Sequence, residues 1–484
     1  MARTRREFLT ASASAAAALA LDPAALAQTA GRPNVLVLII DTLRADYVGA
    51  YGGRAQTPNI DELARQGLRF TRFYPEAMAT VPARRSILTG RRVWPFRGWH
   101  DWRGLRPTPG WEPIREPAST FTSALRRAGY WTAYVTDNPF LGYSAPYRAF
   151  RRSFDSFVGF GGQLGREARH TAESRRLLRQ WLVPELREPN IETRVHRFLA
   201  AGGAYWEDES HSWAAKVYSA GADVLRTAAA RQPFAVVADT FEPHEPWTPP
   251  RSYIDLYGDP GYSDPEPCMS RYARVSEWLS RKRAGPVLRR MRDIYAAEVT
   301  MTDRWLGVMT ARLRELGLDG NTVIVLVADH GYLLGDHGWT GKIASMLHPP
   351  LIHVPLLIVD PARRRAGETS DYLAQTHDIG PTLLAMTGVR RPKAMDGVDL
   401  SPLLARRRPP ERSLAYGGYA NWLYARNERW SFVSENRGRG RRLYDLARDP
   451  LERNNVARRH PRLIDELYRR VVRQAGGRPP IYRS

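Results

Sequence analysis

The hydrophobic positions of the chain form repeated pairs of an amphipathic segment and a short apolar run. The first apolar run, 35-VLVLII-40, ends at Asp41, and such runs are typical of parallel strands buried on both faces. Three later segments repeat the order of helix, short turn and apolar run: 119–138, 219–240 and 303–330. The alternation predicts an α/β fold with a mostly parallel sheet sandwiched by helices.

Between and after these repeats the pattern changes twice. Residues from about 145 to 215 are less regular, and we expect helices and loops above the sheet there. After about residue 405, short alternating segments at 413–436 and 442–447 predict antiparallel strands, and 461–474 predicts a helix. We therefore expect a main domain, 31–405, and a small C-terminal α+β subdomain, 406–484.

The N-terminal segment has the features of an export signal. Arg5 and Arg6 precede a weakly apolar, alanine-rich run that ends in small residues, and this run is too short and mild to span a membrane. The segment resembles a twin-arginine signal, so we predict that residues 1–30 are a signal peptide and that the protein is periplasmic or secreted. We expect no integral membrane segment in the mature chain.

The charge of the chain does not predict a nucleic-acid partner. The net charge is +22 and the isoelectric point is near 10.4, but only four of the 72 basic residues are lysine and the arginines are scattered. Such an arginine bias is more typical of codon composition than of a nucleic-acid-binding groove. A general attraction to anionic substrates stays open. The single cysteine, Cys268, excludes an internal disulfide and a thiolate zinc cluster. The oligomeric state is left open.

Polar residues follow the carboxyl ends of the predicted strands, where functional groups of such sheets gather. Asp41 follows the first run, and the stretches 239-DTFEPHEPW-247 and 328-ADHGYLLGDHGWTGK-342 follow later ones. Asp329 and His330 offer oxygen and imidazole ligands that suit a divalent cation, and Asp41 can complete the site. A helix cap beside a hydrogen-bonded loop histidine would explain the same dipeptide without a metal.

A second pair lies in 79-ATVPARRSILTG-90, where the Thr80 hydroxyl precedes the Arg84 guanidinium by one helical turn. Such a pair can attack and bind an anion. An ordinary helix start, with a threonine cap, Pro82 in the first turn and solvated arginines, explains the same spacing.

The sequence resembles the sulfatase family of the alkaline phosphatase superfamily. The matching stretches appear in the family's order and cover nearly the whole mature chain: 33–52, 57–70, 80–90, 240–247, 328–342, 378–389 and 443–457. The last is a signature of sulfatases rather than of phosphatases in general. The resemblance implies an alkaline phosphatase/sulfatase-like fold and a small anionic ester as the substrate.

The resemblance also implies a role for each matched position. One divalent metal ion would be held by four side chains, those of Asp41, Thr80, Asp329 and His330. The family's usual ion is Ca²⁺, and Mn²⁺, Zn²⁺ and Mg²⁺ are also open. Arg84 would lower the basicity of the nucleophile and bind the ester. Three further side chains would face the ester oxygens, and one of them would protonate the leaving oxygen: His244, His337 and Lys342.

Thr80 departs from the family pattern at the position that decides the chemistry. Sulfatases carry a cysteine or serine there, which is oxidised to formylglycine, and the hydrated aldehyde is the nucleophile. Threonine cannot form that aldehyde, so we expect no formylglycine. Other departures are Thr42 for a second aspartate, 136-TDNP-139 for a Gly-Lys-Trp-His motif, and His353 for an arginine.

Threonine is a nucleophile in other branches of the superfamily, where a phosphothreonine is hydrolysed or passed to an acceptor. We therefore predict an exported, metal-dependent, sulfatase-like hydrolase that cleaves a phosphate or phosphonate (or sulfate) ester through Thr80. An arylsulfatase-type sulfatase, a phosphotransferase and an inactive, anion-binding homologue stay open as alternatives. A group of aromatic residues could stack on an aryl or sugar group, or simply pack: Trp94, Trp99, His100, Trp102 and Trp111.

Overall fold

The structure is a computed structural model of the 484-residue chain, and it describes residues 31–162, 172–202 and 208–482. The predicted signal peptide, residues 1–30, lies outside the described residues. In the part of the chain that is described, no helix has the length and apolar character needed to cross a membrane.

Within these ranges the main sheet has eight strands in the order β12-β2-β11-β8-β1-β7-β5-β6. The neighbouring strands are parallel except around β11, which runs antiparallel to β8 and to β2. The predicted mostly parallel sheet is confirmed. The strands are β1 (Asn34–Ile40), β2 (Leu68–Phe70), β5 (Trp131–Thr136), β6 (Ser156–Gly159), β7 (Phe234–Thr240), β8 (Thr322–Ala328), β11 (Leu356–Val359) and β12 (Thr369–Ser370).

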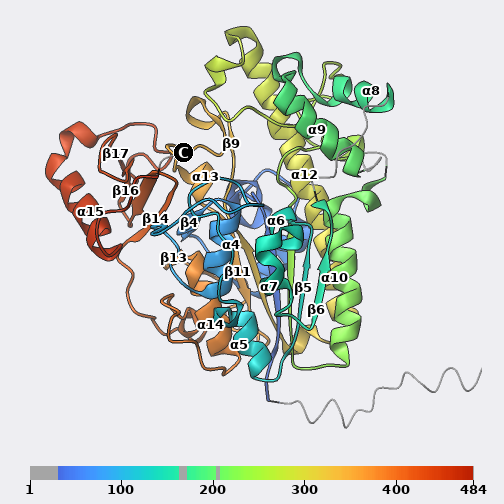
Figure 1. Ribbon diagram of the computed structural model, residues 1–484, viewed down its shortest axis with the longest axis vertical. Helices are drawn as coiled ribbons and strands as arrows, with labels where there is room; N and C mark the ends of the chain where they lie inside the picture. The colour runs from blue at the N-terminus through green and yellow to red at the C-terminus, as the bar shows by residue number, and fades with distance from the viewer. Residues whose placement is uncertain (1–30, 163–171, 203–207, 483–484) are drawn as a thin grey trace, which may run out of the picture.

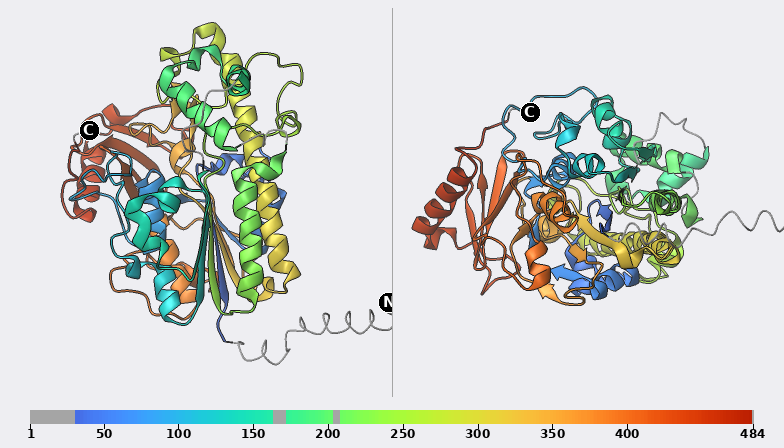
Figure 2. Two further views of the ribbon diagram at one scale, coloured as in Figure 1. Left: turned by 45° about the vertical axis from the view of Figure 1, so that its right-hand side comes forward. Right: turned by 90° about the horizontal axis from the view of Figure 1, so that it is seen from below.

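Helices cover both faces of this sheet (Figures 1 and 2). The long helices α10 (Trp213–Ala229) and α12 (Arg281–Glu315) lie on one face. Buried apolar side chains lie along α12, among them Val287, Met291, Ile294, Met301 and Leu313. Its middle part is buried on all sides, because every residue from Asp293 to Asp303 is buried. The opposite face is covered by α4 (Thr80–Thr89), α5 (Phe121–Arg127) and α14 (Ile379–Met386).

The three central strands, β1, β7 and β8, are buried along their whole length. Each fully buried valine, leucine or isoleucine stabilises the fold by about 1.5–3 kcal/mol relative to an exposed one. Their register aligns Ile40 with Thr240 on one side and with Ala328 on the other. The polar residues at these strand ends therefore meet at one edge of the sheet.

The strand β6 was not predicted. It is only four residues long, pairs with β5 at the edge of the sheet and is partly exposed, so its sequence has no continuous apolar run. The rest of this irregular region agrees with the expected helices, and α8 (Ala172–Trp181) and α9 (Pro189–Gly202) lie above the sheet (Figure 1). Other short elements are α3 (Pro58–Gln66), α6 (Pro139–Tyr143), α7 (Arg148–Arg151), α11 (Arg251–Ile254), α13 (Pro349–Ile352), β3 (Phe73–Tyr74), β9 (Leu333–Leu334), β10 (Thr340–Gly341) and β13 (Ala374–Gln375).

The C-terminal part forms a second sheet in the order β17-β16-β15-β14-β4. The predicted antiparallel strands and the predicted helix are present: β14 (Ala415–Tyr419), β15 (Trp422–Arg426), β16 (Trp430–Glu435), β17 (Arg442–Asp445) and α15 (Pro461–Gln474). Its fifth strand, β4 (Ala77–Met78), pairs parallel with β14 and comes from the main domain. The domain boundary at 405 and 406 stays a prediction, but this sheet reaches to within two residues of Thr80.

A buried charged group joins the two parts of the chain. Glu452 accepts a hydrogen bond from His348 Nδ1 at 2.7 Å and forms an ion pair with Arg426. Burial alone would raise the pKa of Glu452, but Arg426 and His348 outweigh burial and hold that pKa at about 2.

Replacing Glu452 with glutamine is expected to lower the free energy of unfolding by about 3–5 kcal/mol at neutral pH, because Arg426 would stay buried without its counter-ion. The folded-state pKa of about 2 lies below the ordinary value of 4.5. The contribution of this carboxylate to the free energy of unfolding is therefore fully present above about pH 4.5, and it is lost as the pH falls towards 2.

Urea denaturation at several pH values measures this effect, and the gap between wild type and Glu452→Gln should narrow as the pH falls through that range. Glu428→Gln, at an exposed carboxylate in the turn between β15 and β16, is the control and should stay close to wild type. A gap that does not change with pH would contradict the assignment.

Candidate active site

Three buried aspartates meet at the carboxyl edge of the central strands. Asp41 follows β1, Asp239 lies near the end of β7 and Asp329 follows β8, and all three are fully buried. Arg84 reaches them from the helix α4 and is also fully buried. Its Nη1 lies 3.0 Å from Asp41 Oδ2 and 2.5 Å from Asp329 Oδ2, and its Nη2 lies 2.6 Å from Asp239 Oδ1. One guanidinium therefore holds three carboxylates together.

Asp239 was not among the site residues predicted from the sequence. Its second oxygen accepts hydrogen bonds from Arg84 Nε at 2.9 Å and from Tyr134 Oη on β5 at 2.7 Å. Burial raises the pKa of Asp239, and Arg84 opposes that rise. The sequence did contain a signal for Asp239, which is a charged residue inside an otherwise apolar strand. A buried charge requires a partner, so such a residue indicates a polar contact in the fold.

Asp41, Asp329 and His330 form a group whose ligand atoms all lie within 4.8 Å of one another. The Nδ1–H of His330 donates to the carbonyl of Gly331 at 3.0 Å, so Nε2 carries the free lone pair. That Nε2 is buried without a hydrogen-bond partner and lies 3.4 Å from Asp329 Oδ2. Burial lowers the pKa of His330 to about 4, so the imidazole is neutral, as a metal ligand must be.

The charges around this group also fit a cation. Burial and the neighbouring Asp329 raise the pKa of Asp41 to about 7, although Arg84 is in contact with it. Thr42 stands where the family pattern has a second aspartate. Its hydroxyl donates a hydrogen bond to Asp41 Oδ1 at 2.5 Å, and its backbone N–H donates one to Asp329 Oδ1 at 2.9 Å. Thr42 therefore orients the two carboxylates without adding a third charge. The donor set of two carboxylates and one imidazole suits a divalent metal ion.

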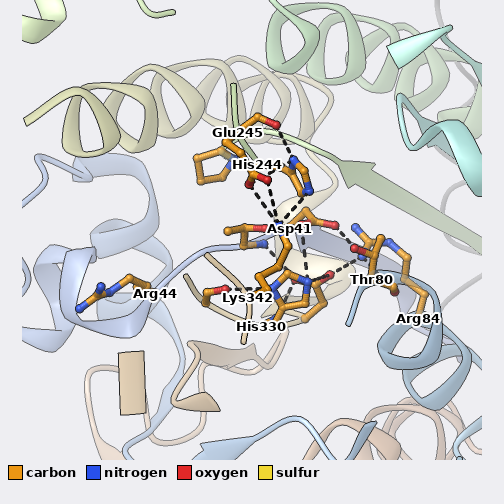
Figure 3. A network of polar contacts seen from close by, with 12 residues as sticks. Asp41, Arg44, Thr80, Arg84, His244, Glu245, His330 and Lys342 are labelled. Atoms are coloured by element: carbon orange, nitrogen blue, oxygen red, sulfur yellow. Dashed lines mark hydrogen bonds and ion pairs between the residues drawn. The ribbon is translucent and has the colours of Figure 1, made fainter. Parts of the chain in front are cut away.

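Thr80 is the first residue of α4 and is almost completely buried. The N-cap position is taken by Ala79, and Arg84 donates a hydrogen bond to the Thr80 carbonyl at 3.3 Å. The ordinary helix start with a threonine cap and a solvated Arg84 therefore does not describe this segment. Figure 3 shows Thr80 and Arg84 on the same side of Asp41.

Across the site, Lys342 and Glu245 form a second charged group, and His244 lies against it (Figure 3). Lys342 Nζ lies 3.1 Å from His244 Nε2 and 3.1 Å from Glu245 Oε2. The Nδ1–H of His244 donates to the Glu245 carbonyl at 2.7 Å, so Nε2 is the acceptor. Burial holds the pKa of His244 well below its ordinary value and also lowers the pKa of Lys342, which the Glu245 carboxylate partly restores.

Glu245 is the second residue that sequence reasoning missed. It is fully buried, and besides Lys342 it binds Arg194 Nη2 at 3.0 Å and the hydroxyl of Tyr272. It lies directly after His244 in the stretch identified from the sequence, but only the tertiary contacts show that it anchors two cations.

The structure does not bring His337 to this site. His337 is exposed, and its ring stacks on His348 with a centroid distance of 4.0 Å. It does not line the pocket above Thr80. The other predicted site residues lie at the carboxyl edge of the sheet or line that pocket: Asp41, Thr80, Arg84, His244, Asp329, His330 and Lys342.

The pocket above Thr80 is narrow, with a volume of about 40 Å³. It is lined by cationic and by aromatic side chains: Ala79, Thr80, Arg106, Thr108, Trp111, Phe140, Arg194, Phe241, His244, Tyr272, Lys342 and Tyr419. Of the aromatic residues singled out in the sequence, Trp111 lines it. Trp94 packs on Tyr416, and Trp99 packs on Tyr482.

Comparison with known families identifies the architecture. Residues 33–389 match the family model described as sulfatase, and residues 335–475 match the one described as N-sulphoglucosamine sulphohydrolase, C-terminal. The chain belongs to the sulfatase family. This sulfatase-family protein is therefore a hydrolase of the sulfatase/alkaline phosphatase superfamily, which acts on sulfuric or phosphoric esters.

Relatives of this sulfatase-family protein carry names of both kinds. An arylsulfatase of Clostridium perfringens is 25% identical over 93% of this chain and 96% of its own length. The multifunctional alkaline phosphatase superfamily protein PehA of Trinickia caryophylli is 27% identical over 78% of each chain. The solved phosphonate monoester hydrolase of Agrobacterium radiobacter shares the fold, with a TM-score of 0.67, 22% identity and coverage of 92% of this chain and 95% of its own.

The metal content of the purified protein tests the donor set. We expect about one divalent ion per chain after dialysis, because one group of two carboxylates and an imidazole offers one site. His330→Ala should retain well under half of that amount, as measured by elemental analysis. His337→Ala is the matched control and should retain the full amount. Two tightly held ions in the wild type, or a full complement in His330→Ala, would contradict the assignment.

Proposed function

We propose that this sulfatase-family protein is an exported, metal-dependent hydrolase of phosphate or phosphonate esters with Thr80 as the nucleophile. The observation that carries the proposal is a threonine at the start of α4, beside Arg84 and at the base of the pocket that Lys342 and His244 line. A threonine hydroxyl cannot become formylglycine, whereas it can carry a phosphoryl group.

Asp41, Asp329 and His330 would hold the metal ion, and Thr80 would complete its shell. When bound, the ion supplies positive charge that stabilises the ester oxygens and increases the acidity of the nucleophile. We propose Ca²⁺ as the first candidate from the family resemblance, with Mn²⁺, Zn²⁺ and Mg²⁺ as alternatives, because His330 also suits the transition metals.

The other charged residues of the site have separate proposed roles. Arg84 has its donors occupied by Asp41, Asp239 and Asp329, so we infer that it positions Thr80 and moderates the charge of the carboxylates. Lys342 and His244 line the pocket above Thr80, and we propose that they contact the ester there.

In the proposed reaction, Thr80 gives up its hydroxyl proton to solvent, Oγ1 attacks phosphorus, and the bond from phosphorus to the leaving oxygen breaks. The leaving oxygen takes a proton from Lys342, whose ammonium is held by Glu245. Water then attacks phosphorus, the bond to Thr80 Oγ1 breaks, and one water proton restores the Thr80 hydroxyl. Lys342 takes its proton back from solvent. His244 is neutral and accepts a hydrogen bond from Lys342, so it can direct that proton but does not supply one itself.

A sulfatase is the second candidate, because the arylsulfatase relative matches this chain over nearly its full length. That activity would need a turnover route without the aldehyde hydrate. A phosphotransferase and an inactive, anion-binding homologue are further outcomes of the experiment below.

We also propose that the twin-arginine segment directs export of the folded protein. Changing Arg5 and Arg6 together to lysine is expected to leave the precursor in the cytoplasm, because this pathway reads the paired arginines. Cell fractionation measures the distribution, and Arg3→Lys in the same segment is the control that should be exported normally. Normal export of the double variant would refute the signal assignment.

Substitutions of Thr80 test the nucleophile on a panel of aryl phosphate monoesters and diesters, phosphonates and sulfates. Thr80→Ala should lower kcat by at least roughly 10³-fold because the attacking oxygen is lost, while the metal content stays nearly unchanged. Thr80→Ser should keep much of the phosphoesterase activity. Thr89→Ala is the control, since the Thr89 hydroxyl at the other end of α4 bonds only to the Arg85 carbonyl in the described contacts.

Thr80→Cys, co-expressed with a formylglycine-generating enzyme, is the complementary variant. Pro82 and Arg84 already supply the Cys-x-Pro-x-Arg pattern, so we expect sulfatase activity to rise relative to phosphatase activity. If Thr80→Ala turned over every active substrate as fast as the wild type, Thr80 would not be the nucleophile.

A further inference from the structure

The cations of the pocket above Thr80 differ in how they are neutralised. Lys342 and Arg194 both bind the buried carboxylate of Glu245. Arg106 lines the same pocket from an exposed loop, and within the described ranges no carboxylate contacts its guanidinium. Arg106 is therefore a cation at the pocket without a counter-ion of its own.

Aromatic side chains lie beside Arg106. Trp111 and Phe140 line the pocket and contact each other edge to face at a centroid distance of 4.7 Å. The guanidinium carbon of Arg106 lies 5.9 Å from the Trp111 ring centroid and 6.0 Å from that of Phe140. Nearer to Lys342, Phe241 stacks on His244 with a centroid distance of 4.1 Å. The pocket thus offers cations and aromatic rings together.

The size of the pocket limits what it can enclose. A cavity volume of about 40 Å³ is roughly three times the 10–15 Å³ that one enclosed water molecule needs. It is suited to the tetrahedral head of an ester and too small for an aromatic ring as well. Arg106 and Tyr272 are exposed members of the lining. A leaving group that extends toward solvent on the Arg106 side would pass Trp111 and Phe140 as well.

We propose that Arg106 determines specificity by binding a second anionic group, a carboxylate on an aromatic leaving group. A guanidinium matches a carboxylate with two parallel hydrogen bonds, and aromatic walls favour a flat ring. The substrate class is then an aryl phosphate or phosphonate ester that carries a carboxylate. This inference rests on the proposed function for the position of the ester head at Thr80.

Binding of two non-hydrolysable substrate analogues to the metal-loaded protein tests the inference. We expect the wild type to bind 4-carboxyphenylphosphonate about 10- to 100-fold more tightly than phenylphosphonate in calorimetry, since a charge-assisted pair contributes on this scale. Arg106→Gln should abolish that preference and change the affinity for phenylphosphonate by less than about threefold. Arg103→Gln, at an exposed arginine of the same loop that does not line the pocket, should behave as the wild type.

Two results would overturn the inference. One is a wild type that does not bind the carboxylated analogue more tightly. The other is an Arg106→Gln variant that loses both analogues equally, because Arg106 would then bind the tetrahedral group itself. The binding measurement does not need turnover. If the protein hydrolysed no ester but still preferred the carboxylated analogue through Arg106, only the proposed function would be wrong. Thr80-dependent hydrolysis without the preference would sink only the present inference.

Discussion

The ion pairs of Arg84 with Asp41, Asp239 and Asp329 are the interaction on which the site depends. The register of three parallel, fully buried strands brings the three carboxylates to one edge, and each buried charge would cost several kcal/mol without a partner. Arg84 stabilises all three and thereby fixes α4 against the sheet. Thr80 lies one helical turn before Arg84, so its position at the pocket follows from the same contacts.

The charges explain why this arrangement suits a metal ion. Three carboxylates and one guanidinium leave a net charge of −2 when all four are ionised, which one divalent cation would balance. The group around Glu245 has the opposite charge balance. One Glu245 carboxylate pairs with both Arg194 and Lys342, which leaves a net positive charge for the ester. The C-terminal sheet reaches the site through β4, which pairs with β14 just before Thr80, and Glu452 links Arg426 of β15 to His348.

Local patterns in the sequence predicted much of this structure. Continuous apolar runs predicted β1, β7 and β8, and therefore the edge where Asp41, Asp329 and His330 lie. What could not be predicted depends on contacts between distant segments. The pairing of Ala77 with Gly418 joins residues separated by most of the chain, and the stacking of His337 on His348 has no local signal. Asp239 and Glu245 were inside identified stretches, but their roles follow from Arg84 and Lys342 across the fold.

The central claim is that Thr80 becomes covalently modified during turnover. Mass spectrometry of the protein quenched within milliseconds of mixing with an aryl phosphate measures this directly. The account predicts a transient phosphothreonine at position 80 of the wild type. In Thr80→Ser it predicts a transient phosphoserine at the same position. Turnover with no covalent intermediate at any time, or with the phosphoryl group on another side chain, would contradict it.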